Sequence, residues 1–368
     1  MSTIKVNKIE NTNTADGGVA IDSSGHVQVD GLQMPTAGAL SHRNLVVNGS
    51  MIVAQRDTSV TGVANNSDEG YQTLDRFALL FANSAGGVCT VSQDTDVPSN
   101  EGFSSSYKVD VTTADTSVAA THMIYVAHKV EAQNIRNSGW NYTSASSYVT
   151  LSFWVKSSKA GTYVFAARAN DAGAVYYPFE YTLVANTWTK VTHSFPGDSS
   201  LVIDNDNGNG FELRWYLVVG TDRDNATANQ WNANNTTNAA TSNQVNFFDS
   251  TSNEFYLTGV QLEVGEKATP FEHRSFGDEL ARCNRYYELV RGGGGMYWSS
   301  GNICGSATYK VEKRDTPSTV ATSTVHYNNP SSSTWTAANI TKHGFTVQRS
   351  ASSSYIIVDA TWSVDAEL

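Results

Sequence analysis

Three hydrophobic stretches carry side chains with the chemistry to bind a sugar. In TLSFWVKS, GTYVFAARAN and FELRWYLVV, apolar residues alternate with the period of a β-strand. The apolar set predicts the core-facing side of each strand. The side chains left facing outward are Trp154, Arg168, Arg214 and Tyr216. Aromatic planes offer flat apolar area and Arg offers fixed donors, which suits sugar rings and their hydroxyl or carboxylate groups.

We expect these four side chains to share one sheet face and to bind a glycan. The alternative is that a helix or a sister chain covers that face. The side chains predicted to point inward are Leu151, Phe153, Val155, Tyr163, Phe165, Phe211, Leu213, Trp215 and Leu217. Trp188, in ANTWTKVTHSF, is also expected in the core.

Sequence patterns typical of catalysis are lacking. The chain has no GxSxG, HExxH, Walker loop or dinucleotide fingerprint, and its eight histidines are scattered without ligand spacing. A glycosidase needs two carboxylates across a cleft. The strand carboxylates available for such a pair are Glu180, Glu212, Glu254 and Glu263, and nothing in the sequence brings two of them together. We expect no catalytic residue, no metal ligand and no enzyme activity.

One polar segment resembles the start of a calcium loop. It is Asp204–Gly210 (DNDNGNG), but the twelfth position is Trp215 instead of the Glu that such loops require. A polar turn between strands is the favoured interpretation, and a weak cation site with oxygen ligands is the alternative.

The net charge of −11 excludes some partners. No Lys/Arg cluster occurs, so we expect neither nucleic-acid binding nor attachment to an anionic membrane surface. No apolar run approaches the 18 residues or more of a membrane-spanning helix. Met1–Ile9 lacks the apolar core of a secretion signal, so we expect synthesis and folding in a cytoplasm. The three cysteines, Cys89, Cys283 and Cys304, have no disulfide spacing and are expected to be free buried thiols.

The elements that must position these residues are almost all strands. Many short alternating segments separated by turn clusters predict an all-β fold, an antiparallel sandwich or barrel, over residues 42–274. The predicted strands are Leu45–Ala54, Arg76–Phe81, Val88–Gln93, Tyr107–Thr112, Met123–Val130, Tyr148–Ser157, Gly161–Ala169, Val175–Leu183, Thr187–Phe195, Phe211–Val219 and Glu254–Val264. Two longer loops, Asn137–Ser147 and Thr221–Gln244, lie between them.

Residues 1–41 read as an extended arm. Val19, Ile21, Val27 and Val29 alternate with polar residues over two very short strands, which cannot bury a core alone. We interpret this segment as an attachment or oligomerising arm. The alternative is a leader without fixed structure.

Residues 275–295 are predicted to be a helix followed by a glycine tether. Ser275 and Asp278 form a capping box that favours a helix start, and Gly292–Gly295 follows as the tether. The apolar stripe of the helix is Leu280, Cys283, Tyr287 and Val290. A helix this short is marginal alone in water. It must pack either on its own sandwich or on the same helix in sister chains, where the stripe would form the seam.

Residues 296–368 predict a small C-terminal β domain, with strands near Met296–Lys310, Thr319–Tyr327, Gly344–Gln348 and Tyr355–Val364. Aromatic residues recur along it. Three of them are further candidates for glycan binding: Trp298, Tyr309 and Trp335.

The central region resembles the jelly-roll carbohydrate-binding modules attached to xylanases and related enzymes. The matching segments are NLVVNGSM (Asn44–Met51), YVTLSFWVKSS (Tyr148–Ser158), ANTWTKVTHSFPG (Ala185–Gly197) and FYLTGVQLEVG (Phe255–Gly265). Such modules often hold a structural calcium with an Asp in the closing strand and an acidic residue after the opening Asn-Gly. Thr258 and Ser50–Met51 stand at these positions here. No cofactor is therefore expected, and a structural calcium is the alternative.

The whole chain resembles fibre proteins of marine bacteriophages, particularly those that infect cyanobacteria. The resemblance rests on IKVNKIEN, GGVAIDSSGHVQVDGLQ, RNLVVNGSMIVAQR, YQTLDRFAL, GVQLEVGEKATPFEHRSFGDELARCNRYY and the final DAEL. It implies a homotrimer on the virion, joined to the tail or an adaptor protein through the N-terminal arm, that binds host-envelope glycans as a tail fibre. A purely structural virion component, such as a head fibre or spacer, and an enzyme that degrades envelope polysaccharide are the alternatives.

Overall fold

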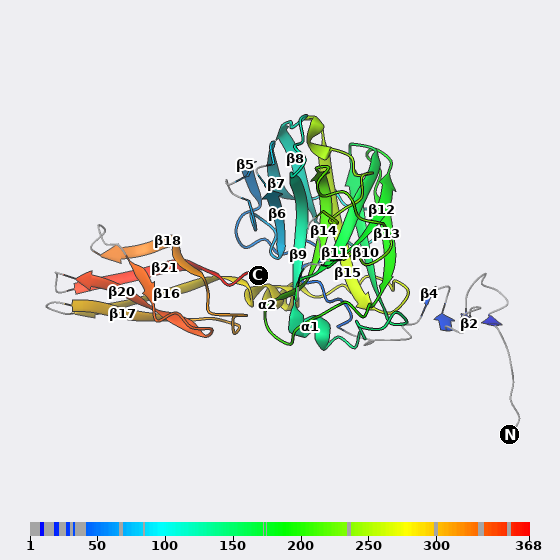
Figure 1. Ribbon diagram of the computed structural model, residues 1–368. Helices are drawn as coiled ribbons and strands as arrows, with labels where there is room; N and C mark the ends of the chain where they lie inside the picture. Colours follow the sequence, from blue (N-terminus) through cyan, green and yellow to red (C-terminus); the bar gives the residue numbers. More distant parts are fainter. Residues whose placement is uncertain are drawn as a thin grey trace, which may run out of the picture.

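The chain, seen in a computed structural model, forms three parts in a row (Figure 1). An arm of short strands comes first, a two-sheet sandwich follows, and a further β-sheet projects on the other side of the sandwich. The structure describes residues 8–10, 18–21, 27–29, 32–33, 42–65, 69–83, 85–171, 173, 175–233, 237–297, 301–329, 335–351 and 355–368. Strands dominate these residues, which confirms the predicted all-β fold class.

The arm is a small antiparallel sheet with one apolar face. Its strands pair in chain order: β1 (Lys8–Glu10), β2 (Gly18–Ile21), β3 (Val27–Val29) and β4 (Leu32–Gln33). Ile9 lies opposite Val19, and Ile21 lies opposite Val27. Residues directly opposite one another share a face, so these four apolar side chains lie together. All four are exposed, from 38% for Val27 to 64% for Ile9.

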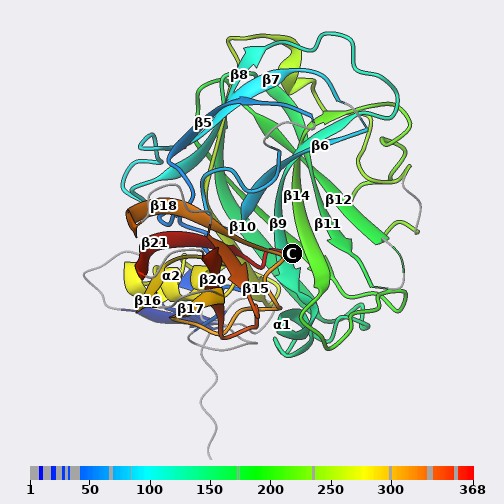
Figure 2. The ribbon, with the colours of Figure 1, turned by 90° about the vertical axis from the view of Figure 1, so that its left-hand side faces the viewer.

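Two antiparallel sheets form the sandwich (Figure 2). The six-stranded sheet has the order β13-β10-β15-β8-β7-β5 and the five-stranded sheet has the order β12-β11-β14-β9-β6. The strands are β5 (Ser59–Val63), β6 (Phe77–Ala82), β7 (Val88–Asp94), β8 (Ser106–Thr113), β9 (Met123–Glu131), β10 (Tyr148–Ser157), β11 (Gly161–Ala169), β12 (Val175–Leu183), β13 (Thr189–Pro196), β14 (Asn209–Val219) and β15 (Glu254–Val264).

The core between the sheets contains every side chain predicted to point inward along β10, β11 and β14. The Trp215 ring lies 5.7 Å from the Phe153 ring of the opposite sheet and 5.2 Å from the Phe165 ring of its own sheet. Trp231, from the long loop before β15, also packs against this core and donates its indole N–H to Pro196 O at 2.8 Å. The period of the strands therefore predicts the core correctly.

The predicted strand Leu45–Ala54 is wrong, because this segment forms turns. Asn48 and Met51 have left-handed backbones, with φ of 62° and 60°. The Asn48 amide donates to the backbone oxygens of Val53 and Asp75 and accepts from Val53 N, so it replaces the ladder bonds of a strand. Asn adopts the left-handed conformation more readily than most residues. Asn48 is therefore a local indication of a turn, which a pattern of hydrophobic alternation does not take into account.

The helices of the described residues are all short. They are α1 (Ala132–Arg136), the 3₁₀ turn η1 (Phe247–Asp249) and α2 (Phe276–Asn284). None of them is long and apolar enough to cross a membrane. The predicted cap of α2 is correct, since Ser275 Oγ accepts a hydrogen bond from Asp278 N at 3.2 Å.

The helix stops earlier than predicted. After α2 ends at Asn284, the chain starts strand β16 (Tyr287–Tyr297), which pairs with β21 over its whole length. Tyr287 and Val290 therefore belong to a strand, and the predicted helical seam through Leu280, Cys283, Tyr287 and Val290 does not exist. Cys283, Tyr287 and Val290 are buried within this chain. The helix packs on its own chain, which was the alternative to packing on sister chains.

The predicted glycine tether is also part of β16. A Cβ on Gly293 would lie 2.1 Å from Val358 O, and a Cβ on Gly292 would lie 2.5 Å from Ala307 Cβ. Close approach of neighbouring strands therefore requires glycine here. The C-terminal β domain begins at Tyr287, so the predicted boundary at residue 296 cuts through a strand.

The C-terminal sheet has the order β18-β21-β16-β17-β20-β19. Its other strands are β17 (Gly301–Thr308), β18 (Thr319–Asn329), β19 (Thr336–Ala338), β20 (Gly344–Ala351) and β21 (Tyr355–Asp365). Trp362, which is 1% exposed, is central to its core and donates its indole N–H to Gly292 O at 3.0 Å. The single strand predicted near Met296–Lys310 is instead the end of β16 together with β17.

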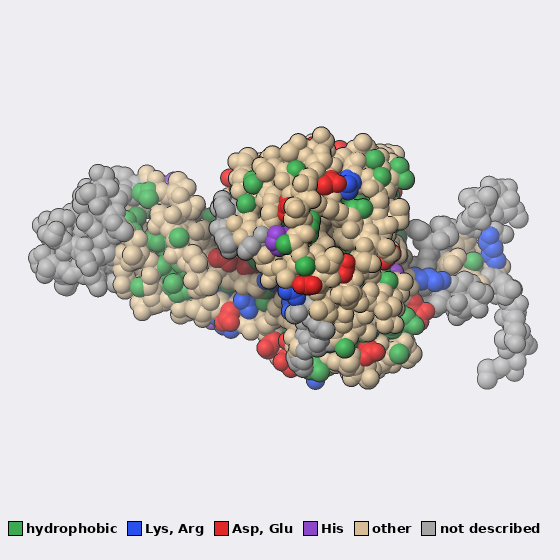
Figure 3. Space-filling view, turned by 45° about the horizontal axis from the view of Figure 1, so that its top comes forward, with side chains coloured by type: hydrophobic (Ala, Val, Ile, Leu, Met, Phe, Trp, Pro, Cys, Tyr) green, Lys and Arg blue, Asp and Glu red, His purple; other side chains and the backbone are tan. Residues whose placement is uncertain are grey.

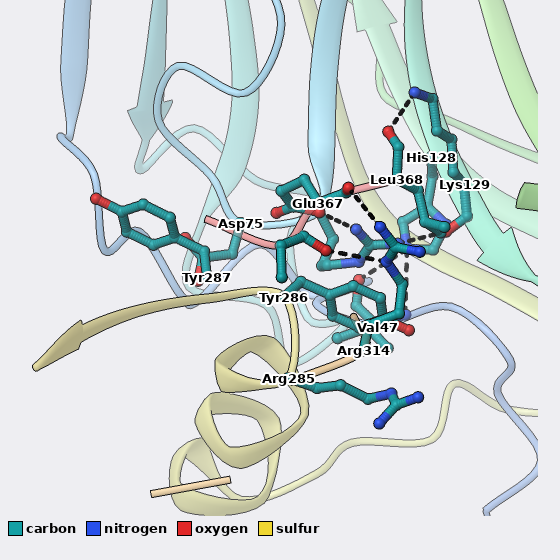
Figure 4. Close-up of polar contacts among 12 residues, drawn as sticks. Val47, Asp75, His128, Lys129, Arg285, Tyr286, Tyr287, Arg314, Glu367 and Leu368 are labelled. Carbon is teal, nitrogen blue, oxygen red and sulfur yellow. Dashed lines mark hydrogen bonds and ion pairs between the residues drawn. The ribbon is translucent and has the colours of Figure 1, made fainter. Parts of the chain in front are cut away.

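A buried polar cluster fastens the end of the chain to the sandwich (Figure 4). The Arg76 guanidinium, which is 1% exposed, forms an ion pair with Glu367 and lies 3.5 Å from the centre of the Tyr286 ring. Lys129 donates a hydrogen bond to the backbone oxygen of Leu368. These contacts join the turn before β6, and strand β9, to the segment that follows β21, so charged groups hold the two parts together.

In the described part of the chain, the cysteines are free buried thiols, as predicted. Cys89 and Cys283 are free and buried. Burial raises the pKa of both thiols, which keeps them protonated at neutral pH. The side chain of Cys304 lies outside the described residues.

Candidate functional site

The four outward-facing residues do not share one face. Trp154 lies on β10 in the six-stranded sheet, whereas Arg168, Arg214 and Tyr216 lie on β11 and β14 in the five-stranded sheet. Outward faces of the two sheets of a sandwich point in opposite directions. The predicted combined site is therefore wrong. Alternation places a side chain on a face of its own strand, but it does not say to which sheet the strand belongs.

Arg214 and Tyr216 are covered by their own chain. They are 5% and 0% exposed and pack with Tyr125, Tyr176 and two alanines of the loop before β15. The Arg214 guanidinium lies 4.4 Å from the centre of the Tyr125 ring. This face is covered, but by a loop of the same chain and not by the helix or the sister chain of the alternative.

The charge of Arg214 is balanced beneath that loop by Glu212. Glu212 Oε2 accepts hydrogen bonds from Arg214 at 2.9 Å and from the half-buried Arg168 at 3.1 Å. Burial acts to raise the pKa of Glu212, but the two guanidinium groups outweigh it and hold this pKa below its ordinary value. In this structure these three residues form a buried ion-pair network and not an accessible ligand site.

Trp154 instead lies in a groove of about 580 Å³ on the outer face of the six-stranded sheet. We call this the Trp154 groove; besides Trp154 it is lined by Gln28, Asn100, Glu101, Ser152, Lys190, Gly259, His273 and residues 267–271. Trp154 is half-buried and pairs with Lys190 on one side and Thr258 on the other. The Lys190 ammonium lies 6.0 Å from the centre of the Trp154 ring.

Three aromatic rings cluster at this groove, and two of them, Phe271 and His273, line it. The ring of Phe103 lies 5.0 Å from that of Phe271 and 5.2 Å from that of His273. Gly259, with φ of 62°, allows the rings to approach the strand, because a Cβ there would lie 2.6 Å from Phe103 and 3.1 Å from Trp154. The rings come from the loop before β8 and from the segment that follows β15, and Trp154 and Gly259 lie on the paired strands β10 and β15.

The groove combines apolar planes with mixed polar groups. Trp154 and Phe271 supply flat area, while Asn100, Glu101 and Lys190 supply donors and acceptors. Concave sites with aromatic walls and a few polar groups are typical of small-ligand and sugar recognition. Figure 3 shows charged side chains only scattered over the face of the sandwich turned to the viewer. A large basic surface is not seen on that face.

Trp188 is not in the core, contrary to prediction. It is half-buried on the outer face of the six-stranded sheet and donates its indole N–H to Asp96 at 2.9 Å. Burial acts to raise the pKa of Asp96, but hydrogen bonds from Lys156 and Trp188 lower it. The Lys156 ammonium also lies 4.2 Å from the centre of the Tyr256 ring. These side chains satisfy one another and lie outside the lining of the Trp154 groove.

The predicted aromatic sites of the C-terminal domain are not accessible where the structure describes them. Tyr309 and Trp335 are 7% and 8% exposed and belong to the core of the C-terminal sheet. In a domain this small, large aromatic residues are needed to fill the core, which explains their recurrence. Trp298 lies outside the described residues.

Residues missed by the sequence reasoning are Phe103, Phe271, His273 and Lys190. The three rings belong to loops, which have no period that could mark them. PFEH at residues 270–273 carried the only local signal, an aromatic pair just after the closing strand.

The four candidate carboxylates lie in different surroundings. Glu254 and Glu263 lie nine residues apart on β15, which is about 30 Å along an extended strand. Glu212 is buried in its ion-pair network, and Glu180 accepts hydrogen bonds from Thr241 and Asn243. Within the described residues, no group of three His, Cys, Asp or Glu side chains is placed to hold a metal ion.

The segment Asp204–Gly210 has a structural contact. Asn207 donates its amide to the backbone oxygen of Arg314 at 2.5 Å, and the Arg314 guanidinium donates to Asn207 O at 2.8 Å. Asp206 accepts from Gly208 N at 2.9 Å. The polar-turn interpretation fits these bonds, because the turn joins the sandwich to the C-terminal domain.

Comparison with known proteins gives similarity of fold at low identity. No family model and no curated protein matches the sequence. A solved structure of the enzymatically active domain of tailspike protein 4 from bacteriophage CBA120 is 15% identical over 56% of this chain and 22% of its own length, with a TM-score of 0.31. The carbohydrate-binding module CBM4 is 11% identical over 60% of this chain and 99% of its own length, also with a TM-score of 0.31.

A family 11 carbohydrate-binding module from a cellulosomal cellulase of Clostridium thermocellum is likewise 11% identical. The match covers 54% of this chain and 94% of the module, with a TM-score of 0.29. This chain thus spans about a fifth of the tailspike domain but most of each module.

Proposed function

We propose that this chain is a virion fibre protein, of the tail-fibre kind, that binds glycans of a host-cell envelope through the Trp154 groove. The observation that carries the proposal is the groove itself, which half-buried Trp154 lines together with Phe271 and His273, while the Phe103 ring packs behind these two rings. Sugars present flat apolar faces ringed by hydroxyl groups, and this groove offers aromatic faces next to amide, carboxylate and ammonium groups.

The arm supports the assembly part of the proposal. Ile9, Val19, Ile21 and Val27 form an exposed apolar face on a sheet too small to bury it. A homotrimer in which three arms pack these faces together, mounted on a tail or adaptor protein, would bury it. Several copies of a weak glycan site would then give useful avidity without a tight single site. The proposed role is therefore glycan binding at the virion surface, without catalysis.

The test is binding of the labelled full chain to an array of envelope polysaccharides. Trp154→Ala is expected to lower the affinity about tenfold or more, since truncating a Trp that dominates an interface costs about 2 kcal/mol or more. Trp188→Ala is the matched control, because Trp188 lies on the same sheet face outside the groove, and it is expected to bind as the wild type does. Equal binding by the Trp154→Ala protein would refute the site. Absence of all binding would favour a purely structural fibre, and release of reducing sugars would favour an enzyme.

A further inference from the structure

The Trp154 groove continues into two further cavities around α2. His273 lines both the Trp154 groove and a neighbouring cavity of about 580 Å³. His42 and Arg282 line that cavity and also a third one of about 340 Å³. We call the third one the Arg282 cavity. The shared lining residues place the three cavities next to one another, in a row from Trp154 to Arg282.

The Arg282 cavity differs from its surroundings in charge. Its lining includes His42, Arg43 and Arg282, together with the polar side chains of Asn134 and Ser138. Among the described residues that line it, none carries a carboxylate. This is unexpected in a chain with a net charge of −11. The described lining of this cavity is therefore basic and polar, without an acidic side chain.

Of the two arginines that line the Arg282 cavity, Arg282 has the weaker charge compensation. One of its five N–H donors is directed at His42 Nδ1, at 2.8 Å. Among the described residues, no carboxylate oxygen lies within 4 Å of its guanidinium. Its neighbours differ, since Arg285 is paired with Glu131 at 2.7 Å and Arg274 is paired with Glu272 at 3.1 Å.

The electrostatics agree with this geometry. Partial burial and the neighbouring charge of Arg274 lower the pKa of Arg282, although nearby carboxylates act in the other direction. A bound anion would offset both effects. Arg43 adds positive charge on the other side of the cavity, although Glu263 lies 3.6 Å from its Nε and partly neutralises it.

We propose that the Arg282 cavity binds an oxoanion, the carboxylate or sulfate group of an acidic sugar residue, so that the ligand of this chain is an acidic polysaccharide. Planar guanidinium groups match the geometry of carboxylate and sulfate oxygens. The polysaccharide would place an uncharged ring against Trp154 and an acidic residue at Arg282. The inference deepens the proposed glycan-binding function and rests on it for the sugar part of the ligand.

The test uses saturation-transfer NMR on the full chain at constant ionic strength with glucuronic acid, glucose 6-sulfate and glucose. The two acidic sugars are expected to bind more tightly than glucose, which lacks the oxoanion. Arg282→Gln is expected to weaken binding of the acidic sugars about tenfold or more, as for the loss of one charge-assisted hydrogen bond. Arg282→Lys, which keeps the positive charge, is expected to retain part of the affinity for the acidic sugars. Arg291→Gln is the control, because Arg291 is an exposed Arg of the C-terminal sheet paired with Asp359.

Inorganic sulfate, added as a competitor, separates the sources of the oxoanion. Displacement of the sugars only at a large excess of sulfate supports recognition of an acidic sugar. Equal displacement by sulfate at matched concentration would overturn the sugar part of the inference. Unchanged affinity in the Arg282→Gln protein, with its fold intact by circular dichroism, would overturn the site. If the Arg282 variants bind normally while Trp154→Ala abolishes polysaccharide binding, the proposed function survives and the oxoanion inference fails.

Discussion

Asp75 is a buried carboxyl group whose protonation is coupled to folding. It is 0% exposed, accepts hydrogen bonds from the backbone and side chain of Gln55, and lies 3.8 Å from Arg56. Burial raises its pKa to about 6, although these partners act against the rise. In the folded chain Asp75 therefore holds its proton up to a higher pH than in the unfolded chain.

The raised pKa of Asp75 makes the free energy of unfolding depend on pH. A carboxyl with a raised pKa stabilises the fold fully below its unfolded pKa of about 4, and this contribution is lost as the pH rises to about 6. Asp75→Asn cannot titrate. We therefore expect the free energy of unfolding of Asp75→Asn, relative to the wild type, to increase by about 2 kcal/mol between pH 4 and pH 7. Urea denaturation at several pH values measures the difference in free energy of unfolding between the two proteins. A difference that stays constant with pH would contradict the raised pKa of Asp75.

Ser275 begins α2, the helix that lines two of the three connected cavities. Its Oγ accepts from Asp278 N and also contacts the Asp278 carboxylate at 2.7 Å. Ser275→Ala is expected to lower the free energy of unfolding by about 1 kcal/mol, the usual cost of losing an N-cap. Thermal or urea denaturation measures this. Ser117→Ala, at an exposed loop Ser outside any helix, is the control, and an equal effect of both changes would argue against the cap.

The elements differ in how well the sequence predicts them. Long alternation predicted β10, β11, β12 and β15 with their observed bounds, because period-2 burial against one core is a local property of the chain. The end of α2 was not predictable in this way. Tyr287–Val290 fits a helical stripe, but pairing of β16 with β21, some seventy residues later in the chain, makes it a strand. Long-range pairing of this kind overrides local periodicity.

The candidate site was predictable only in part. Trp154 was identified from its outward position, but Arg168, Arg214 and Tyr216 belong to the opposite sheet, beneath a loop that alternation does not describe. Phe103 and Phe271 were missed because they are loop residues brought next to β10 only by the fold. Sheet membership and loop packing are properties of the tertiary structure.

At the scale of the whole molecule, the exposed face of the arm predicts self-association. Val19→Asn with Ile21→Asn places polar groups on that face, at positions 40% and 46% exposed. We expect the wild type to sediment as a trimer and the double variant to dissociate. Val184→Asn with Val202→Asn is the matched control, since these exposed apolar residues, 66% and 43% exposed, lie on the sandwich. A monomeric wild type, or an unaffected double variant, would contradict assembly through the arm.

The three parts also divide the roles proposed for the fibre. The arm carries the apolar face, the sandwich carries the Trp154 groove, and the polar cluster around Arg76 and Glu367 fixes the C-terminal sheet to the sandwich. The described aromatic side chains of the C-terminal sheet are largely used in its own core. Ligand binding is therefore expected on the sandwich.

Hydrogen–deuterium exchange of the full chain, with and without a bound envelope polysaccharide, tests this central claim most directly. The proposed site predicts slower exchange on binding in the peptides that contain Trp154, Lys190 and residues 267–273, which line the groove. It predicts no change in β17 to β21 of the C-terminal sheet. Protection confined to the C-terminal sheet, or to the outer face of β11 and β14, would contradict it.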